Sequence, residues 1–118
     1  MEKIDWNGFP LCRKPHKIKR SLELLHKALL SKDVPCSKNM FEIIEIGASG
    51  KYEPGINDGA GYCFNWFCEK YGGNYIAVDL DFQTILLARK KFPKAILHHY
   101  DGIAWLSTLD PKYKISYL

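Results

Sequence analysis

Short apolar runs alternate with segments of helix length along most of this 118-residue chain. The runs lie at residues 41–46, 74–78, 95–100 and 113–118 and are rich in β-branched and aromatic residues. Helical patterns occupy residues 21–33, 62–71, 82–92 and 102–109. Strands that alternate with helices form βαβ units with a parallel sheet and right-handed crossovers. We therefore predict an α/β fold with a Rossmann-like parallel sheet of about four strands and flanking helices.

The chain is of a length that forms one domain with one core. Residues 1–20 are interrupted by turn formers such as Pro10 and Pro15, so we predict an irregular amino-terminal arm. This arm is basic, with a cluster at Arg13, Lys14, Lys17, Lys19 and Arg20. Residues 21–118 are then predicted to form a partial Rossmann-like domain.

Composition narrows the choice of partners. The net charge of +4 is mild, and the basic cluster lacks the interleaved aromatic residues of a single-strand binder, so nucleic acid is disfavoured. No run approaches the ~20 apolar residues of a membrane span, so no membrane association is expected. The four cysteines show no CxxC spacing, and we expect reduced thiols, no metal site and a cytoplasmic location.

Residues 43–61 hold five of the nine glycines, directly behind the first apolar run. Ligands of open parallel sheets bind outside the carboxyl ends of the strands, where glycines let a ligand approach the backbone. Asp79, at the end of the second predicted strand, follows Gly59 by 20 positions, the interval expected of a ribose-binding acid. We infer that residues 51–58 are an insertion and that both ends of this loop face one ligand.

The chain resembles class I S-adenosylmethionine-dependent methyltransferases at three motifs. Residues 45–50 (EIGASG) resemble the family's first motif, which holds the methionine part of the cofactor. Residues 78–81 (VDLD) are similar to the second, whose acid takes the ribose hydroxyls. Residues 100–102 (YDG), with Trp105 and Leu106, resemble the third, which contacts adenine. The implied cofactor residues, with Gly59 added from the loop spacing, are Glu45, Gly47, Ala48, Ser49, Gly50, Gly59, Asp79, Leu80, Asp101 and Gly102.

A shorter likeness covers the arm, where residues 6–11 (WNGFPL) followed by Lys14 and Pro15 resemble the cephalosporin hydroxylase group, which has the methyltransferase fold. The resemblances imply transfer of a methyl group from S-adenosylmethionine to an unidentified acceptor, or a chain that binds the cofactor without turnover. No catalytic base is assigned. The alternatives are another nucleotide-binding α/β domain, disfavoured by the missing GxGxxG, and a non-catalytic interaction module.

The chain ends at Leu118 inside the fourth predicted strand, whereas the family's sheet continues. The resemblance therefore implies an incomplete fold: a fragment, a truncated reading frame, or a domain completed by a partner. Because the last strand is apolar and has no covering helix after it, we expect a homodimer through the carboxyl-terminal end of the sheet.

Five further side chains have simpler predicted roles. Asp81 could replace Asp79 on the ribose, but we favour a role as the cap of the helix that begins at Phe82. Adjacent His98 and His99 should point to opposite faces of their strand. Cys63 and Cys68 are expected to pack in the core, because no His or Lys is placed to lower a thiol pKa.

Overall fold

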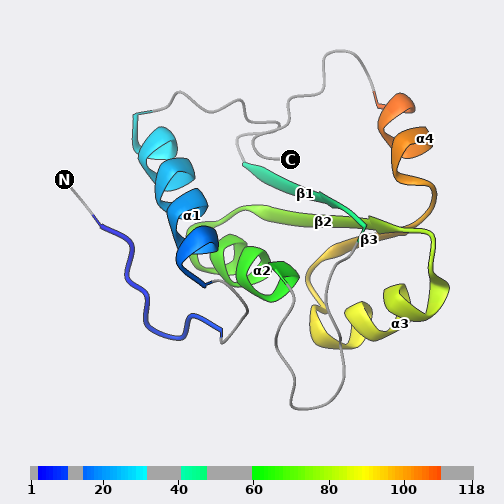
Figure 1. The fold of residues 1–118 in the computed structure, drawn as a ribbon, viewed down its shortest axis with the longest axis horizontal. Helices are drawn as coiled ribbons and strands as arrows, with labels where there is room; N and C mark the ends of the chain where they lie inside the picture. The colour runs from blue at the N-terminus through cyan, green and yellow to red at the C-terminus, as the bar shows by residue number, and fades with distance from the viewer. Residues whose placement is uncertain (1–2, 11–14, 32–40, 48–59, 110–118) are drawn as a thin grey trace.

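The computed structural model describes residues 3–10, 15–31, 41–47 and 60–109 (Figure 1). It shows an α/β fold in which helices flank a three-stranded parallel sheet of order β1-β2-β3. The strands are β1 (Glu42–Ile46), β2 (Asn74–Asp79) and β3 (Ile96–His99), and the helices are α1 (Pro15–Leu30), α2 (Ala60–Tyr71), α3 (Phe82–Lys91) and α4 (Gly102–Ser107). The predicted α/β class is confirmed, while the fourth predicted strand and the insertion lie outside the described residues.

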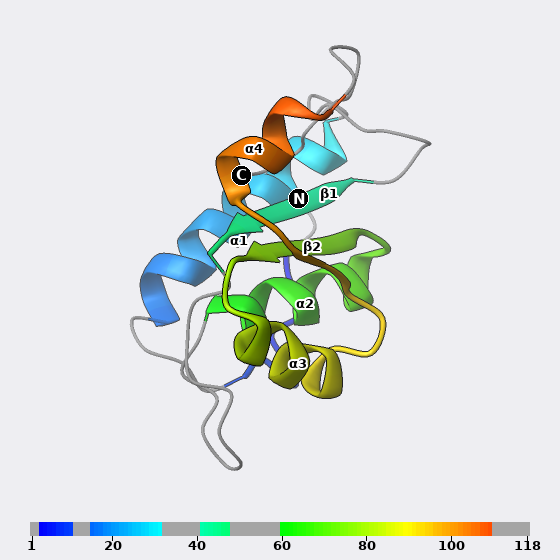
Figure 2. The ribbon, with the colours of Figure 1, turned by 90° about the vertical axis from the view of Figure 1, so that its right-hand side faces the viewer.

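β2 is the middle strand of the sheet. Ile44 of β1 pairs with Ile76, and Leu97 of β3 pairs with Ala77. The chain passes from β1 to β2 through α2 and from β2 to β3 through α3, so both crossovers step in the same direction. Right-handed crossovers that step the same way leave their helices on one face. Figure 2 accordingly shows α2 and α3 on one side of the sheet and α4 on the other.

The face covered by α2 and α3 carries the larger apolar core. Alternate side chains of a strand point to opposite faces, and Ile43, Tyr75 and Ala77 share this one. Phe67 of α2 is fully buried against them. The other buried members of this core are Ile4, Leu22, Leu25, Phe41, Cys68, Ala88 and Phe92.

The opposite face has a smaller cluster under α4. Ile44, Ile76 and Val78 are buried there, and the half-buried ring of Trp105 packs against them. α4 therefore returns over the middle of the sheet after β3, so each face of the sheet carries its own apolar cluster.

The amino-terminal residues 3–10 are packed against α1 and α2. The rings of Trp6 and Trp66 stack with centroids 5.8 Å apart and planes at 11°, and Phe9 meets each of them edge-on at 5.2 Å. The Lys19 ammonium lies 5.1 Å from the centroid of the Trp6 ring, a favourable cation–π position. Ile4 belongs to the main core at 8% exposure, so this part of the arm is an integral layer of the fold.

α1 begins at Pro15, six residues before the predicted start at Ser21. Proline suits the first position of a helix, because its missing N–H would have no intrahelical partner there. The first turns of α1 are mostly polar and exposed, so they lack the apolar period by which the helix was predicted. None of the helices in the described residues is long and apolar enough to cross a membrane.

Candidate functional site

The carboxyl ends of the three strands meet at one edge of the sheet. The N–H of Gly47, directly after β1, donates to the carbonyl of Val78 at 2.7 Å. The N–H of Tyr100, directly after β3, donates to the carbonyl of Asp79 at 3.0 Å. These bonds extend the ladder by one residue beyond β1 and β3 and hold the three strand ends side by side. The glycine turn and the two acid-bearing turns all start from this edge.

Gly47 starts the glycine turn with φ of +78°. This left-handed conformation costs other residues roughly 1–2 kcal/mol. A Cβ at this position would meet no described atom within 4 Å, so the backbone conformation, and not crowding, favours glycine. The remaining predicted residues of the turn, Ala48, Ser49, Gly50 and Gly59, lie outside the described residues.

Asp79 is the last residue of β2 and Asp81 follows the strand, and the two carboxylates have different roles. Asp81 caps α3 as predicted: its Oδ1 accepts from the N–H of Gln83 and its Oδ2 from the hydroxyl of Thr84, both at 3.0 Å. Asp79 uses only Oδ1, which accepts from the N–H of Asp81 at 2.7 Å. Within the described ranges Oδ2 of Asp79 accepts no hydrogen bond. Asp79 therefore has an acceptor oxygen available to a ligand, whereas both oxygens of Asp81 are engaged.

Asp101 repeats this arrangement after β3. It is the N-cap of α4, and its Oδ1 accepts from the N–H of Ala104 at 2.8 Å. Its side chain is exposed, and among the residues described here Oδ2 accepts no bond. The next residue, Gly102, is a glycine because α4 starts close against β1. A Cβ on Gly102 would clash with Cγ2 of Ile46. Packing thus accounts for this glycine without a ligand.

Glu45 lies on the main-core face of β1. Its carboxylate accepts a hydrogen bond from the phenol of Tyr75 on β2 at 2.5 Å. Glu45 pairs with Ala77 in the register, and it therefore shares the face on which Tyr75 and Ala77 are buried. The acid of the first motif is thus linked to the neighbouring strand directly before the glycine turn.

Three large apolar side chains within three residues of Asp79 or Asp101 in the sequence are exposed to solvent. Leu80 is 66% exposed, Phe82 51% and Ile103 80%. Leu80 was predicted as a cofactor residue, whereas Phe82 and Ile103 were not. The sequence indication for Ile103 was its position two residues after Asp101. Hydrophobic periodicity could not add to this indication, because α4 has six residues.

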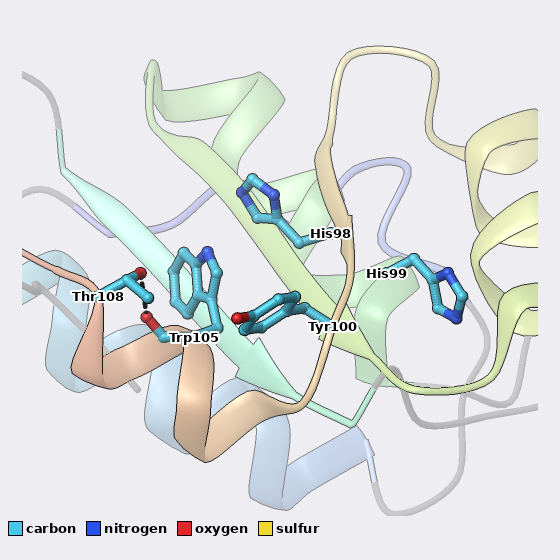
Figure 3. A pocket seen from close by; sticks show the side chains of 5 residues that line it. All are labelled: His98, His99, Tyr100, Trp105 and Thr108. Atoms are coloured by element: carbon cyan, nitrogen blue, oxygen red, sulfur yellow. Dashed lines mark hydrogen bonds between the residues drawn. The ribbon is translucent and has the colours of Figure 1, made fainter.

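A hollow of about 310 Å³, here called the β3 hollow, lies beside the end of β3 and is lined by His98, His99, Tyr100, Trp105 and Thr108 (Figure 3). The rings of His98 and Trp105 lie 5.2 Å apart and are tilted by 32°. The side chain of His99 points away from His98, its Nε2 lies 2.9 Å from the carbonyl oxygen of Leu80, and its ring contacts Phe82. The two histidines thus lie on opposite faces of β3, as predicted.

Trp105 packs on the smaller core. Its half-buried ring lies on Ile44, Ile76 and Val78 beneath α4 and also lines the β3 hollow, so the contact with adenine that the third-motif likeness implies stays a prediction. Tryptophan offers a large apolar area, and burying it here covers the smaller core. The exposed apolar side chains at or near the strand ends include those of Ile46, Leu80, Phe82, Tyr100 and Ile103.

The two cysteines of α2 are core residues. Cys63 and Cys68 are reduced and buried in α2, as predicted, and burial raises the pKa of the Cys68 thiol to about 12. Such a thiol stays protonated at neutral pH and is a poor nucleophile. No group of three or more His, Cys, Asp or Glu side chains in the described residues is placed to hold a metal ion.

Comparison of the chain with protein-family models, curated proteins and solved structures gave no match. The fold and the site define the chain as an α/β protein with a parallel sheet. Its distinguishing feature is an edge where a left-handed glycine and two partly engaged carboxylates lie at or just beyond the ends of adjacent strands.

Proposed function

We propose that the chain binds an adenosine-containing cofactor of the S-adenosylmethionine type at the carboxyl ends of β1, β2 and β3, and acts in methyl transfer. One observation carries the proposal. Asp79 ends β2 and Asp101 lies two residues beyond the end of β3, beside the Gly47 turn. In each carboxylate a backbone N–H holds one oxygen while the other accepts no bond from the described residues. Ligands of parallel sheets bind at this edge.

Each residue has a chemical role in this proposal. Ribose hydroxyls and the adenine amine are donors, and an ionised carboxylate is an acceptor only. Asp79 is the partner for the ribose, and Asp101 is the partner for the adenine amine. The exposed side chains of Leu80 and Ile103 supply apolar surface for the faces of the purine ring. Gly47 lets the chain turn away from β1 so that backbone approaches the methionine part.

S-adenosylmethionine supplies an already activated methyl group when bound. The residues named here then bind and orient it, and orientation for in-line attack is a large part of catalysing a transfer step. The backbone bonds to Asp79 and Asp101 fix the carboxylates before the ligand arrives, which lowers the entropy lost on binding. The methyl acceptor, the homodimer and the cytoplasmic location stay predictions.

Calorimetry with S-adenosylmethionine, S-adenosylhomocysteine and NAD tests the proposal, with Asp79→Asn as the key variant. The amide oxygen of asparagine still accepts from the N–H of Asp81, so the turn is kept while the charge is lost. We expect Asp79→Asn to weaken S-adenosylhomocysteine about 10- to 100-fold, as for a lost hydrogen bond to a charged group. The matched control is Glu23→Gln, which removes one exposed carboxylate from α1 and leaves the affinity unchanged.

Failure of the methionine-containing ligands refutes the proposal. A response to NAD alone supports a different nucleotide-binding domain. If no adenosine ligand binds, the interaction module becomes the better candidate, because Leu80, Phe82 and Ile103 expose a large apolar area along one edge.

A further inference from the structure

The β3 hollow lies apart from the proposed place of methyl transfer. It is beside the end of β3 and has a volume of about 310 Å³. The methionine part of the proposed cofactor lies by Gly47, which follows β1, and β2 separates β1 from β3. Adjacent strands are ~4.8 Å apart, so β3 stands roughly 10 Å from β1 across the sheet. The hollow is therefore not where a methyl acceptor would meet the methyl group.

Three aromatic side chains converge on the hollow. Figure 3 shows Tyr100 extending toward Trp105 with His98 on the same side of β3, while His99 points away. The rings of His98 and Trp105 lie 5.2 Å apart with a tilt of 32°, so each supports the other. The side chain of Tyr100 is 48% exposed, which leaves its ring accessible from solvent. Because the face of an aromatic ring is electronegative, this arrangement can attract a cation.

The polar groups around the hollow also favour a positive charge. The hydroxyl of Thr108 donates to the carbonyl of Trp105 at 2.6 Å, so its one proton is engaged and Oγ1 can offer a ligand only lone pairs. The N–H of Trp105 donates to the carbonyl of Asp101 at 2.8 Å, which places the exposed Asp101 carboxylate within one helical turn of the Trp105 ring. Among the described residues that line the hollow, none is Lys or Arg.

We propose that the β3 hollow binds a small quaternary ammonium compound of the choline type. The methyl groups of the cation lie against the rings of Tyr100 and Trp105, and a hydroxyl on the ligand donates to Oγ1 of Thr108. The described lining has no carboxylate, so a primary ammonium, which is strongly hydrated, would lose its hydrogen bonds there. A quaternary ammonium has no N–H to satisfy and is recognised by ring faces.

The size of the hollow agrees with this class of ligand. Its volume of about 310 Å³ is at the small end of the ~300–1,000 Å³ range of ligand pockets, which suits a single head group. This site does not depend on the proposed cofactor.

NMR of the full chain labelled with ¹⁵N tests the proposal, with choline chloride as the probe up to about 50 mM and sodium chloride as the ionic control. We expect the indole N–H signal of Trp105 to shift and saturate, while those of Trp6 and Trp66 stay in place. The neutral analogue of choline, in which carbon replaces the quaternary nitrogen, has nearly the same shape. It should bind about 5-fold more weakly or worse, because it lacks the attraction to the ring faces.

Variants of Tyr100 separate a contact between ring and cation from simple filling of the hollow. Tyr100→Phe keeps the ring and should keep the choline affinity within about 2-fold, whereas Tyr100→Leu should weaken choline about 3- to 10-fold. Because Tyr100 is exposed, both variants should fold, and their spectra verify it. Phe82→Leu is the matched control: Phe82 is also about half exposed and does not line the hollow, so the choline affinity should not change.

Four results would overturn the proposal. It is wrong if choline leaves the Trp105 signal in place, if the neutral analogue binds equally well, or if Tyr100→Leu behaves like Phe82→Leu. It is also wrong if adenosine moves the Trp105 signal at lower concentration than choline, because the hollow would then belong to the adenosine site. The cofactor proposal is tested by Asp79→Asn with S-adenosylhomocysteine, so the two proposals can fail separately.

Discussion

Replacing Gly73 with alanine should lower the free energy of unfolding by about 1–2 kcal/mol, for a steric reason. A Cβ at this position would overlap three ring atoms of Phe41, the farthest of them at 2.6 Å. The Phe41 ring is 5% exposed and meets Phe67 with centroids 5.6 Å apart, so it has no free space to move into. Overpacking of this kind costs roughly 1–3 kcal/mol. Alanine also lowers the conformational entropy of the unfolded chain, which offsets about 0.4–1 kcal/mol of that cost.

The neighbouring Gly72 gives a matched control with a different cause. Its φ is +83°, and no described atom lies within 4 Å of a Cβ built there, so Gly72→Ala costs only backbone strain. Asparagine tolerates this conformation better than alanine, and Gly72→Asn should recover part of the loss. At Gly73 the larger asparagine should be worse than alanine, because the obstacle there is the Phe41 ring.

A double-mutant cycle measured by urea unfolding separates the two mechanisms. In a Phe41→Leu background the ring is gone, so Gly73→Ala should lose at least about 0.5 kcal/mol of its cost, while Gly72→Ala should keep its full cost. The reasoning fails if Gly73→Ala is neutral in the native background, or if Phe41→Leu leaves its cost unchanged.

Two further outcomes follow from the described contacts. Asp81→Ala should lower the free energy of unfolding by about 0.5–2 kcal/mol in urea titrations, because the α3 cap is lost. Asp81→Asn should keep most of this stability, and equal losses in the two variants would argue against capping. Iodoacetamide at pH 8, read by peptide mass mapping, should leave Cys68 unmodified until the chain unfolds. Burial raises the pKa of Cys68 in the folded chain to about 12, so the thiol of the unfolded chain ionises at lower pH. The free energy of unfolding should therefore fall as the pH rises above the ordinary thiol range. Rapid labelling of Cys68 in the folded chain would refute this account of its burial.

Elements with a strong local signal were predictable from the sequence. β1, β2 and β3 lie within two residues of the predicted runs, because β-branched apolar stretches bounded by turn residues leave few other conformations. The cap at Asp81 and the opposed histidines of β3 were also predictable, since both depend on spacing along one element.

Features that depend on distant segments were not predictable in this way. The stack of Trp6 on Trp66 joins residues 60 positions apart, and no hydrophobic periodicity within residues 1–20 predicts it. The bond from Tyr75 to Glu45 needs the register of β1 against β2. Trp105 was assigned by likeness to a motif, whereas its place follows from where α4 crosses the sheet.

The aromatic contact between the first residues and α2 also sets the smallest unit that can fold. A shortened chain starting at Ser21, the boundary suggested by composition, would uncover one side of Trp66 and remove Ile4 from the main core. It would also delete the first six residues of α1. A shortened version made for expression should therefore keep Trp6, because without it the remaining chain is expected to expose apolar surface and to be poorly soluble.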